Sequence, residues 1–442
     1  MNLNVKREHG YVRFWTFFAL LAAIIFVRYG LQIDIPRGFA LIPIVAIAVL
    51  GNQTEVVAIC MCLIPLHESL DFYYALVLVV AIYVIRFYRR IKTNASFFLM
   101  LIIVIWELLH CLAADFSPMD FIISLAPIIA LTVILCSDFS DLDYGFVVRT
   151  VAVAALLTCM TMLVQVAWIS RFNLTKFLLN LRRLGSISEA GQDRLQFSGG
   201  LVQTNSLGVI CVLTAATLIQ LRIIGQKRRS DMFAMLTLLI FGTFTASRTF
   251  LVCLVLMVLL MLLGQKGGLK KLRYLGMAVL AVALILLFFG LFFPDQLEFY
   301  ISRFFVADIT TGRDDLMVNY HNFIVRNPNV MFFGIGLQDF GDKLMGVYRV
   351  ANNIPHNSLQ EIIVAWGIPG LICVALLILH LIVRARLTHG RRKLVNYIPL
   401  VIILFKSIAG QLLTSNYSVL ALGFSYLSLI QDLDKDTTVS DQ

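Results

Sequence analysis

The feature that most constrains this chain is a series of apolar runs that recurs from one end of the sequence to the other. The hydrocarbon core of a membrane is about 30 Å thick, and a helix of about 20 apolar residues crosses it. Hydrophobic residues make up 60% of the sequence and charged residues 14%, whereas soluble domains carry about 25% charge. Because a helix satisfies its own backbone hydrogen bonds in lipid, we predict an all-α, polytopic integral membrane protein.

About fourteen segments have this apolar character, and two short ones, 39–50 and 56–66, leave twelve spans as the alternative. The first long run, Phe14–Phe26, has no small-residue cleavage site, so we interpret it as a membrane helix and not as a signal peptide. The other segments are Phe72–Ile85, Ser96–Ala113, Phe121–Cys136, Phe146–Ile169, Gly200–Ile223, Met232–Phe244, Phe250–Leu263, Leu275–Phe293, Leu359–Val383, Tyr397–Leu413 and Val419–Ile430.

All eight cysteines fall inside these apolar runs. A disulfide framework would place them in outer loops. We therefore expect buried side chains that fill space between helices, and neither disulfides nor metal or redox chemistry.

Short basic loops predict the orientation of the chain, because cytoplasmic loops are enriched in Lys and Arg. With a cytoplasmic N-terminus and either twelve or fourteen spans, all four basic loops fall on the cytoplasmic side. The net charge of +10 therefore reflects membrane orientation, and its placement argues against binding of nucleic acid. The four loops are Arg86–Lys92, Lys227–Arg229, Lys266–Arg273 and Arg384–Lys393.

This topology predicts seven regions along the chain. The large loop has a plausible helix, Asp314–Val325, followed by the turn-rich stretch Gly334-Ile335-Gly336, and loops of this length are usually functional. The regions are a cytoplasmic N-terminus (1–13), N-terminal membrane helices (14–169), a first outer loop (170–199), central membrane helices (200–293), a large extracytoplasmic loop (294–357), C-terminal membrane helices (358–431) and a cytoplasmic polar tail (432–442).

Several arginines remain on the predicted outer side, against the orientation rule. Arg194 lies in the first outer loop, Arg313 lies in the large loop, and Arg248 lies at the tip of the tight hairpin Thr245–Thr249. Arginine suits a phosphate or diphosphate, because its planar fork donates two parallel charge-assisted hydrogen bonds. For most outer basic residues, solvated loop charge and anchoring to lipid headgroups are the favoured explanation. For Arg248, whose short loop gives it little freedom to leave, we favour an anionic ligand.

His356 precedes the long apolar segment that begins at Leu359. Asn357 or Ser358 is placed to cap that helix. A neutral imidazole at this position is able to accept a proton from a sugar hydroxyl. A histidine at a membrane interface without a chemical role is the alternative, and for His356 taken alone it is the favoured one.

The order of these elements resembles a family, the bacterial O-antigen ligase and Wzy-type polysaccharide polymerase superfamily. The resemblance spans roughly Arg194 to Gly370. In one respect the chain departs from the family, since Thr204 stands where proline often precedes the asparagine. The matching elements are Arg194–Gly199 with Asn205–Gly208, Thr245–Arg248, Gly312-Arg313, Asn327-Pro328, Gly334–Leu337, and His356–Leu359 followed by Trp366–Gly370.

The resemblance implies an undecaprenyl-diphosphate-linked oligosaccharide as donor, a glycan or lipid acceptor, and metal-independent glycosyl transfer without a cofactor. It also implies a multi-pass protein of the bacterial cytoplasmic membrane with its active site outside, among membrane lipids, with a flippase and a chain-length regulator as possible partners. The residues carried over are catalytic His356, Arg248 and Arg313, and substrate-binding Arg194, Asn205, Asn357, Gly334 and Gly336.

The chemistry of these side chains is compatible with such a reaction. A diphosphate is a good leaving group, so fixed cations such as Arg248 and Arg313 would suffice to stabilise it. The acceptor hydroxyl is a weak nucleophile and needs a base, for which His356 is the candidate. A single displacement would invert the anomeric carbon. Asp314 and Asp315, beside Arg313, are interpreted as neutralising it or capping a helix.

Three alternatives remain at this point. We favour a polymerase slightly over a ligase, since the two share donor chemistry and differ in acceptor. A transporter should have structural repeats and ionisable residues near the membrane midplane. The sequence has no repeat that we detect, and we interpret its intramembrane Glu107 and Lys406 as scattered. A scaffolding protein would need no arginine and histidine cluster.

Overall fold

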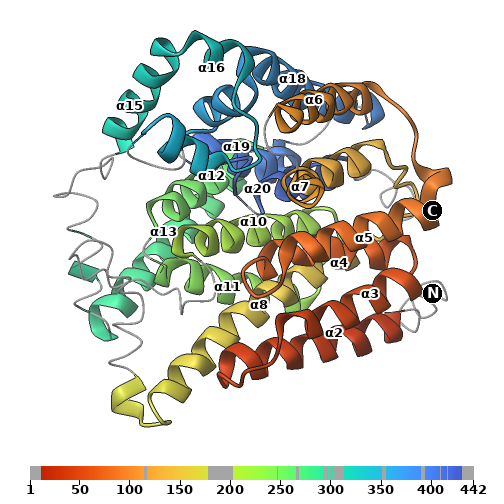
Figure 1. Ribbon diagram of the computed structural model, residues 1–442. Helices are drawn as coiled ribbons and strands as arrows, with labels where there is room; N and C mark the ends of the chain where they lie inside the picture. The colour runs from red at the N-terminus through yellow and green to blue at the C-terminus, as the bar shows by residue number, and fades with distance from the viewer. Residues whose placement is uncertain are drawn as a thin grey trace.

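The computed structural model confirms an all-α, polytopic membrane protein (Figure 1). It describes residues 11–113, 117–177, 203–245, 247–264, 268–292, 313–350, 355–389, 394–408, 410–415 and 417–430, and residues 294, 297, 298 and 301. The longer helices are α2 (Val12–Ile25), α3 (Leu41–Leu50), α4 (Gln53–Leu66), α5 (Phe72–Phe87), α6 (Ala95–Leu112), α7 (Pro118–Cys136), α8 (Tyr144–Ile169), α10 (Thr204–Ile223), α11 (Arg229–Phe244), α12 (Arg248–Gly264), α13 (Gly268–Phe292), α15 (Arg313–Arg326), α18 (Ser358–His389), α19 (Ile398–Ile408) and α20 (Ser418–Ile430).

Each of the fourteen predicted apolar segments is a helix in the described part of the chain. Seven helices are long and apolar enough to cross a membrane by length and composition, and several others, such as α3 and α4, are shorter apolar helices. Three predicted boundaries differ by five residues or more. The last-but-one segment, expected to reach Leu413, stops being helical at Ile408. The segment expected from Leu275 begins as α13 at Gly268, and the segment expected to end at Val383 continues as α18 to His389.

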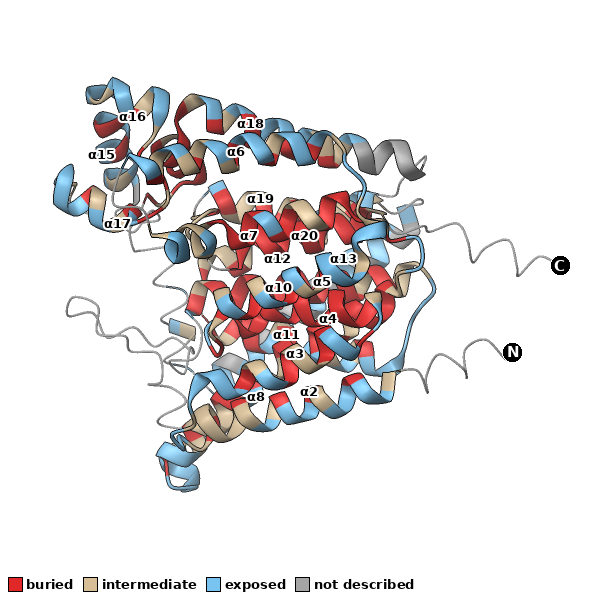
Figure 2. Ribbon diagram, turned by 45° about the vertical axis from the view of Figure 1, so that its right-hand side comes forward, coloured by how far each residue is buried: buried red, intermediate tan, exposed pale blue. Residues whose placement is uncertain are grey.

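The helices form a buried centre and an outer layer of half-exposed helices (Figure 2). Every residue of α4 from Thr54 to Leu66 is buried, and so is α20 from Ser418 to Leu429. The outer helix α2 instead has a span that is only 22% buried. Outer helices keep large apolar side chains such as Ile85 exposed, which is expected of a surface that faces lipid and not water. All eight cysteines are buried and free, as predicted from their positions.

The first turns of α10, α12 and α18 meet at one end of the bundle, as described below, and α19 ends there. The other ends of α10, α12 and α18 therefore lie at the opposite end of the bundle, about 30 Å away along a 20-residue helix such as α10. Described residues of three of the four predicted basic clusters belong to that end. Lys227 and Arg228 follow α10, Lys270, Lys271 and Arg273 lie in the first turns of α13, and Arg384 and Arg386 lie near the end of α18.

This arrangement makes a testable prediction about topology. Lys176, beyond the end of α8, and Lys227, beyond the end of α10, are both exposed. Cysteines introduced at these two positions should react with a membrane-impermeant maleimide from opposite sides of the membrane. Because the native cysteines are buried, wild-type protein should give little background. Labelling of both variants from one side would contradict the fold as a membrane-spanning bundle.

Candidate functional site

A polar cavity of about 520 Å³ opens where the starts of α10 and α12, the residues before α18 and the loop between α19 and α20 meet. The described residues that line it carry amides, hydroxyls, one imidazole and one ammonium, and none is acidic. They are Gln203, Asn205, Ser206, Val209, Thr249, His356, Lys406, Gly410, Gln411, Ser415 and Tyr417.

The hairpin that carries Arg248 is tied to the start of α10 beside this cavity. Ser247 donates from its hydroxyl to Asn205 Oδ1 at 3.0 Å and accepts the Phe250 N–H at 3.3 Å, so it also caps α12. Gly208 permits this close approach, because a Cβ there would lie 2.9 Å from Phe250 Cβ. Two sequence elements of the predicted site, 42 residues apart, are therefore in contact.

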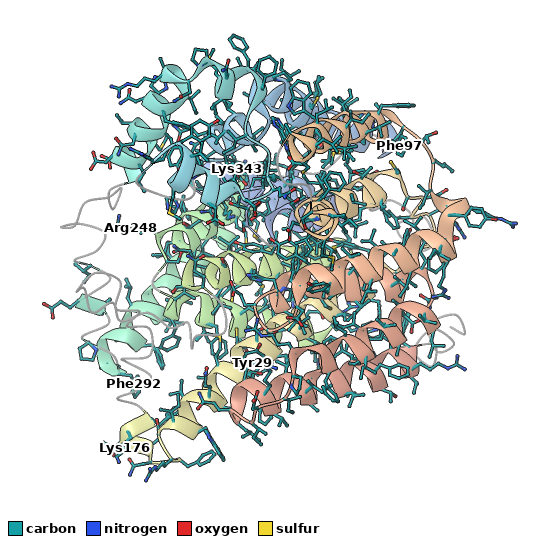
Figure 3. The ribbon with its side chains drawn as sticks, in the orientation of Figure 1. Tyr29, Phe97, Lys176, Arg248, Phe292 and Lys343 are labelled. Carbon is teal, nitrogen blue, oxygen red and sulfur yellow. The ribbon has the colours of Figure 1, made fainter. Side chains whose placement is uncertain are left out.

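Arg248 begins α12 and is half-buried. It precedes Thr249, which lines the cavity. Figure 3 shows Arg248 and Lys176 both toward the left of the molecule, with Lys343 above them and nearer the centre. Because its neighbour Thr249 lines the cavity, Arg248 lies at the cavity's rim.

His356 lines the cavity just before α18 begins. Asn357 is the predicted cap of that helix, since its Oδ1 accepts the Leu359 N–H at 2.9 Å. Its Nδ2 also donates to the Ile408 carbonyl at 3.0 Å, and Ser358 Oγ donates to the Gly410 carbonyl at 3.1 Å. These bonds connect Asn357 and Ser358 to the end of α19 and to the residue that follows it. His356, which directly precedes Asn357, is therefore positioned by both α18 and the end of α19.

Glu361, one turn into α18, holds the opposite wall of the cavity. Its side chain is 0% exposed and accepts the N–H groups of Leu412 at 2.7 Å, Leu413 at 2.9 Å and Thr414 at 2.8 Å. The Thr414 hydroxyl donates a fourth bond. A buried carboxylate needs such donors, because its charge is costly to desolvate. Glu361 therefore sets the shape of the 410–417 loop, which supplies four of the lining residues.

Lys406 brings a positive charge into the cavity wall from the last turn of α19. Its ammonium donates to the Gln411 carbonyl and to Ser418 Oγ, and it lies 5.1 Å from the centroid of the Tyr417 ring. Within the described residues it makes no ion pair. The interpretation of Lys406 as a scattered intramembrane charge is wrong, since it shares one cavity with His356 and Asn205.

The Tyr417 ring connects the cavity to the end of α4. The His67 ring lies 5.0 Å from the Tyr417 ring, and the His67 side chain is also close to Glu68, at 3.5 Å. The hydrogen bond from His67 holds the pKa of the Glu68 carboxyl below its usual range. Glu68 is therefore a carboxylate at neutral pH, placed behind the cavity wall and outside the cavity.

The Gly334-Ile335-Gly336 element packs against a break in α18 and does not line the cavity. The helix is interrupted at Gly367, whose φ is 67°. Pro369 has no N–H to donate to the Ala365 carbonyl, which accepts the Gly336 N–H at 2.9 Å instead. A Cβ on Gly334, whose φ is +80°, would lie 2.3 Å from the same carbonyl oxygen. The contacts give both glycines a packing role, and their role in substrate binding stays a prediction.

Glu107 of α6 secures this junction from the other side. Its Oε1 accepts the N–H groups of Leu337 at 2.7 Å and Gln338 at 3.1 Å, and its Oε2 accepts the Trp366 indole N–H at 2.7 Å. The side chain is fully buried. The interpretation of Glu107 as scattered is therefore also wrong, because it contacts two segments that each lie more than 200 positions further along the sequence.

The predicted helix 314–325 is confirmed as α15, Arg313–Arg326, with Tyr320 and Phe323 buried. Gln360 Nε2 donates to the Met317 carbonyl at 2.7 Å and so joins α15 to the start of α18. Arg313 begins α15 one turn before Met317, about 6 Å along the helix axis. The side chain of Arg313 and all of Arg194 lie outside the described residues.

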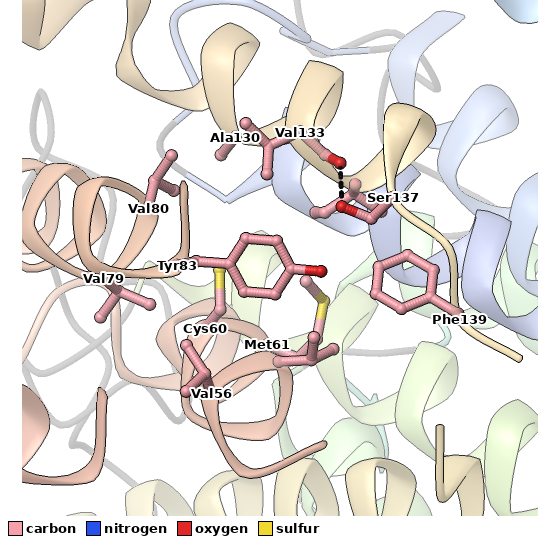
Figure 4. A pocket seen from close by; sticks show the side chains of 12 residues that line it. Val56, Cys60, Met61, Val79, Val80, Tyr83, Ala130, Val133, Ser137 and Phe139 are labelled. Atoms are coloured by element: carbon pink, nitrogen blue, oxygen red, sulfur yellow. Dashed lines mark hydrogen bonds between the residues drawn. The ribbon is translucent and has the colours of Figure 1, made fainter. Parts of the chain in front are cut away.

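A second cavity, between α4, α5 and α7, has a different character (Figure 4). Its empty space is about 320 Å³, and its walls are mostly aliphatic and aromatic, among them Val79, Val80 and Phe139. The two hydroxyls there, of Tyr83 and Ser137, bond to Gln53 and to the Val133 carbonyl. This is a gap between packed helices and offers no charged group for chemistry.

A comparison with protein families gives a match for the segment that contains Arg248 and His356. Residues 232–375 match the family model of O-antigen ligase. This segment is similar to O-antigen ligase. Members of this family are membrane enzymes that act on lipid-linked glycans. No curated protein matches the chain.

The O-antigen ligase match covers only part of the cavity. Arg248, His356 and Asn357 lie within the matched segment, whereas Asn205 and Lys406 lie outside the matched segment. Sequence reasoning had proposed Asn205 but not Lys406, Glu361 or Glu107. Their residue types could have pointed to all three, because an ionisable residue within a membrane helix usually has a functional or structural role.

Proposed function

We propose that this protein is a glycosyltransferase that transfers or polymerises undecaprenyl-diphosphate-linked glycan repeat units at the outer face of the bacterial cytoplasmic membrane. One observation carries the proposal. In a chain with a segment similar to O-antigen ligase, a histidine, a partly buried ammonium and the rim residue Arg248 converge on one polar cavity at the ends of apolar helices.

The reaction follows from these groups. The acceptor hydroxyl approaches His356, which removes its proton as the oxygen attacks the anomeric carbon. The bond from that carbon to the diphosphate breaks, and the lipid diphosphate leaves with the electron pair. Arg248, with Arg313 at the start of α15, stabilises the negative charge that develops there. A single displacement inverts the anomeric carbon, and no metal ion or cofactor takes part.

The distribution of basic residues supports the placement of the cavity on the outer side of the membrane. Described residues of three of these basic clusters lie at the bundle end opposite the cavity, and cytoplasmic loops are the ones enriched in Lys and Arg. A cavity on the outer side would receive a lipid-linked glycan after its transport across the membrane. A flippase and a chain-length regulator are therefore the partners we expect.

A polymerase is slightly favoured over a ligase, and a transporter of lipid-linked substrates is the second alternative. Reconstitution with a defined undecaprenyl-diphosphate oligosaccharide separates them. A polymerase elongates the lipid-linked chain, and a ligase requires a separate lipid or surface carrier in the vesicles. A transporter moves the substrate across the bilayer without forming a glycosidic bond, which would refute the proposal.

In the same assay, His356→Ala should slow transfer by about 10²–10⁴-fold, because positioned general bases contribute that much. Arg248→Gln should slow transfer through loss of charge stabilisation at the leaving group. The controls are His321→Ala and Arg326→Gln on α15, both exposed, which should leave the rate unchanged. If inserted His356→Ala and Arg248→Gln proteins made full-length product, the assigned chemistry would be wrong.

A further inference from the structure

We propose that Lys406, together with the first turn of α10, forms a phosphate subsite that holds one phosphate of the lipid diphosphate, beside the sites of Arg248 and Arg313. This inference rests on the proposed function and adds a residue outside the segment that matches O-antigen ligase. Its starting point is that Lys406, Asn205 and Ser206 line the same cavity.

The surroundings of the Lys406 ammonium are those expected of a cation that binds an anionic ligand. An ammonium has three N–H donors. Two of them bond to the Gln411 carbonyl and Ser418 Oγ, which leaves one for the cavity that the side chain lines. An ammonium taken out of water is costly unless it is paired. Within the described residues, Lys406 makes no ion pair, so an entering anion would supply its counter-charge.

The nearby carboxylate of Glu361 does not take that place. It is committed to the three N–H groups and the hydroxyl of the 412–414 loop. These bonds hold the loop that also supplies Gln411, an acceptor for Lys406. Glu361 therefore fixes the position of the Lys406 ammonium through the loop, and the charge of Lys406 still faces the cavity.

The start of α10 supplies a second source of positive potential to the same cavity. α10 is 20 residues long, and its N-cap, Gln203, makes no side-chain capping bond. The first N–H groups of a helix have no partner within it, and they carry the positive end of the helix dipole. Gln203, Asn205 and Ser206 line the cavity. Such a terminus beside a lysine is suited to a phosphate.

Phosphate explains this wall better than a neutral sugar. Sugar hydroxyls need both donors and acceptors, and carboxylates are the usual strong acceptors in glycan sites, whereas none of the described lining residues is acidic. The polyprenyl chain of the same ligand would extend along the apolar helices. Lys406 lies in the last turn of the apolar helix α19, at the level where a lipid diphosphate leaves the hydrocarbon.

Equilibrium binding to the full-length protein in phosphatidylcholine nanodiscs tests the subsite. The probes are sugar-free undecaprenyl diphosphate and uncharged undecaprenol. Lys406→Met, which keeps length and removes charge, should weaken binding of the diphosphate at least tenfold and leave undecaprenol binding unchanged. Lys406→Arg should restore most of the diphosphate affinity. Lys176→Met, the same charge change at an exposed position near the same end, should bind both probes as wild type does.

Equal binding of the diphosphate by Lys406→Met and wild type would overturn the subsite and leave the proposed function standing. An equal loss for both probes would also overturn it, because Lys406 would then only support the loop. If the wild type does not prefer the diphosphate to undecaprenol, the subsite and the proposed function both fail.

Discussion

Replacing Glu361 by alanine is expected to abolish measurable transfer and to lower the free energy of unfolding by about 3–5 kcal/mol. The carboxylate is fully buried and accepts three backbone N–H groups and one hydroxyl of the 412–414 loop. Alanine would leave these N–H groups buried without an acceptor, and each such group costs about 1–3 kcal/mol. The loop would move, and a 1 Å displacement near reacting groups is able to cost about 10²-fold in rate.

Thermal unfolding of the purified protein and the reconstituted transfer assay measure the two effects separately. Glu361→Gln should be intermediate, because the amide oxygen still accepts while the amide nitrogen faces N–H donors. Glu68→Gln is the matched control, since Glu68 is exposed by 43% and lies behind the same wall. A stable and active Glu361→Ala protein would show that the 410–417 loop does not form part of the working site.

The helical fold was predictable because hydrophobic length is a local property of the sequence. Segments such as Phe146–Ile169 and α8 differ by two residues at one end. The errors occur where polar backbone re-enters the bundle. The run to Leu413 is apolar in sequence, yet it leaves the helix after Ile408, because the next residues bond to Glu361 and Ser358 of another helix. Such partners are not visible in a window of neighbouring residues.

The site was predictable where residues occur in motifs and not where they act alone. Asn205, Arg248 and His356 stand in recognisable short elements, and the structure brings Asn205 and His356 into one cavity with Arg248 at its rim. Glu107 and Lys406 stand singly in apolar helices. Their roles depend on contacts with residues such as Trp366 and Tyr417, far along the chain or across a loop, so sequence spacing carried no information about them.

Replacing Gly334 by alanine is expected to prevent accumulation of folded protein. Gly334 has a φ of +80°, a region that costs a residue with a Cβ about 1 kcal/mol or more. Its Cβ would also lie 2.3 Å from the Ala365 carbonyl oxygen and 2.6 Å from the Trp366 nitrogen, so backbone would meet backbone at the break in α18. Neither partner moves freely, because Ala365 bonds to Gly336 and Trp366 bonds to Glu107.

The comparison with Gly346→Ala separates packing from substrate contact. Gly346 belongs to the same large loop, and a Cβ there would meet nothing within 4 Å. This control should therefore accumulate and unfold like the wild type when both proteins are followed by fluorescence-detected size-exclusion chromatography. If Gly334 instead served mainly to let the loop approach a substrate, Gly334→Ala would fold normally and lose only affinity for the lipid-linked glycan. That outcome would support the substrate-binding role of Gly334 that the family resemblance implies. It would also mean that the loop is able to shift against α18, although its hydrogen bonds to α18 predict a rigid junction.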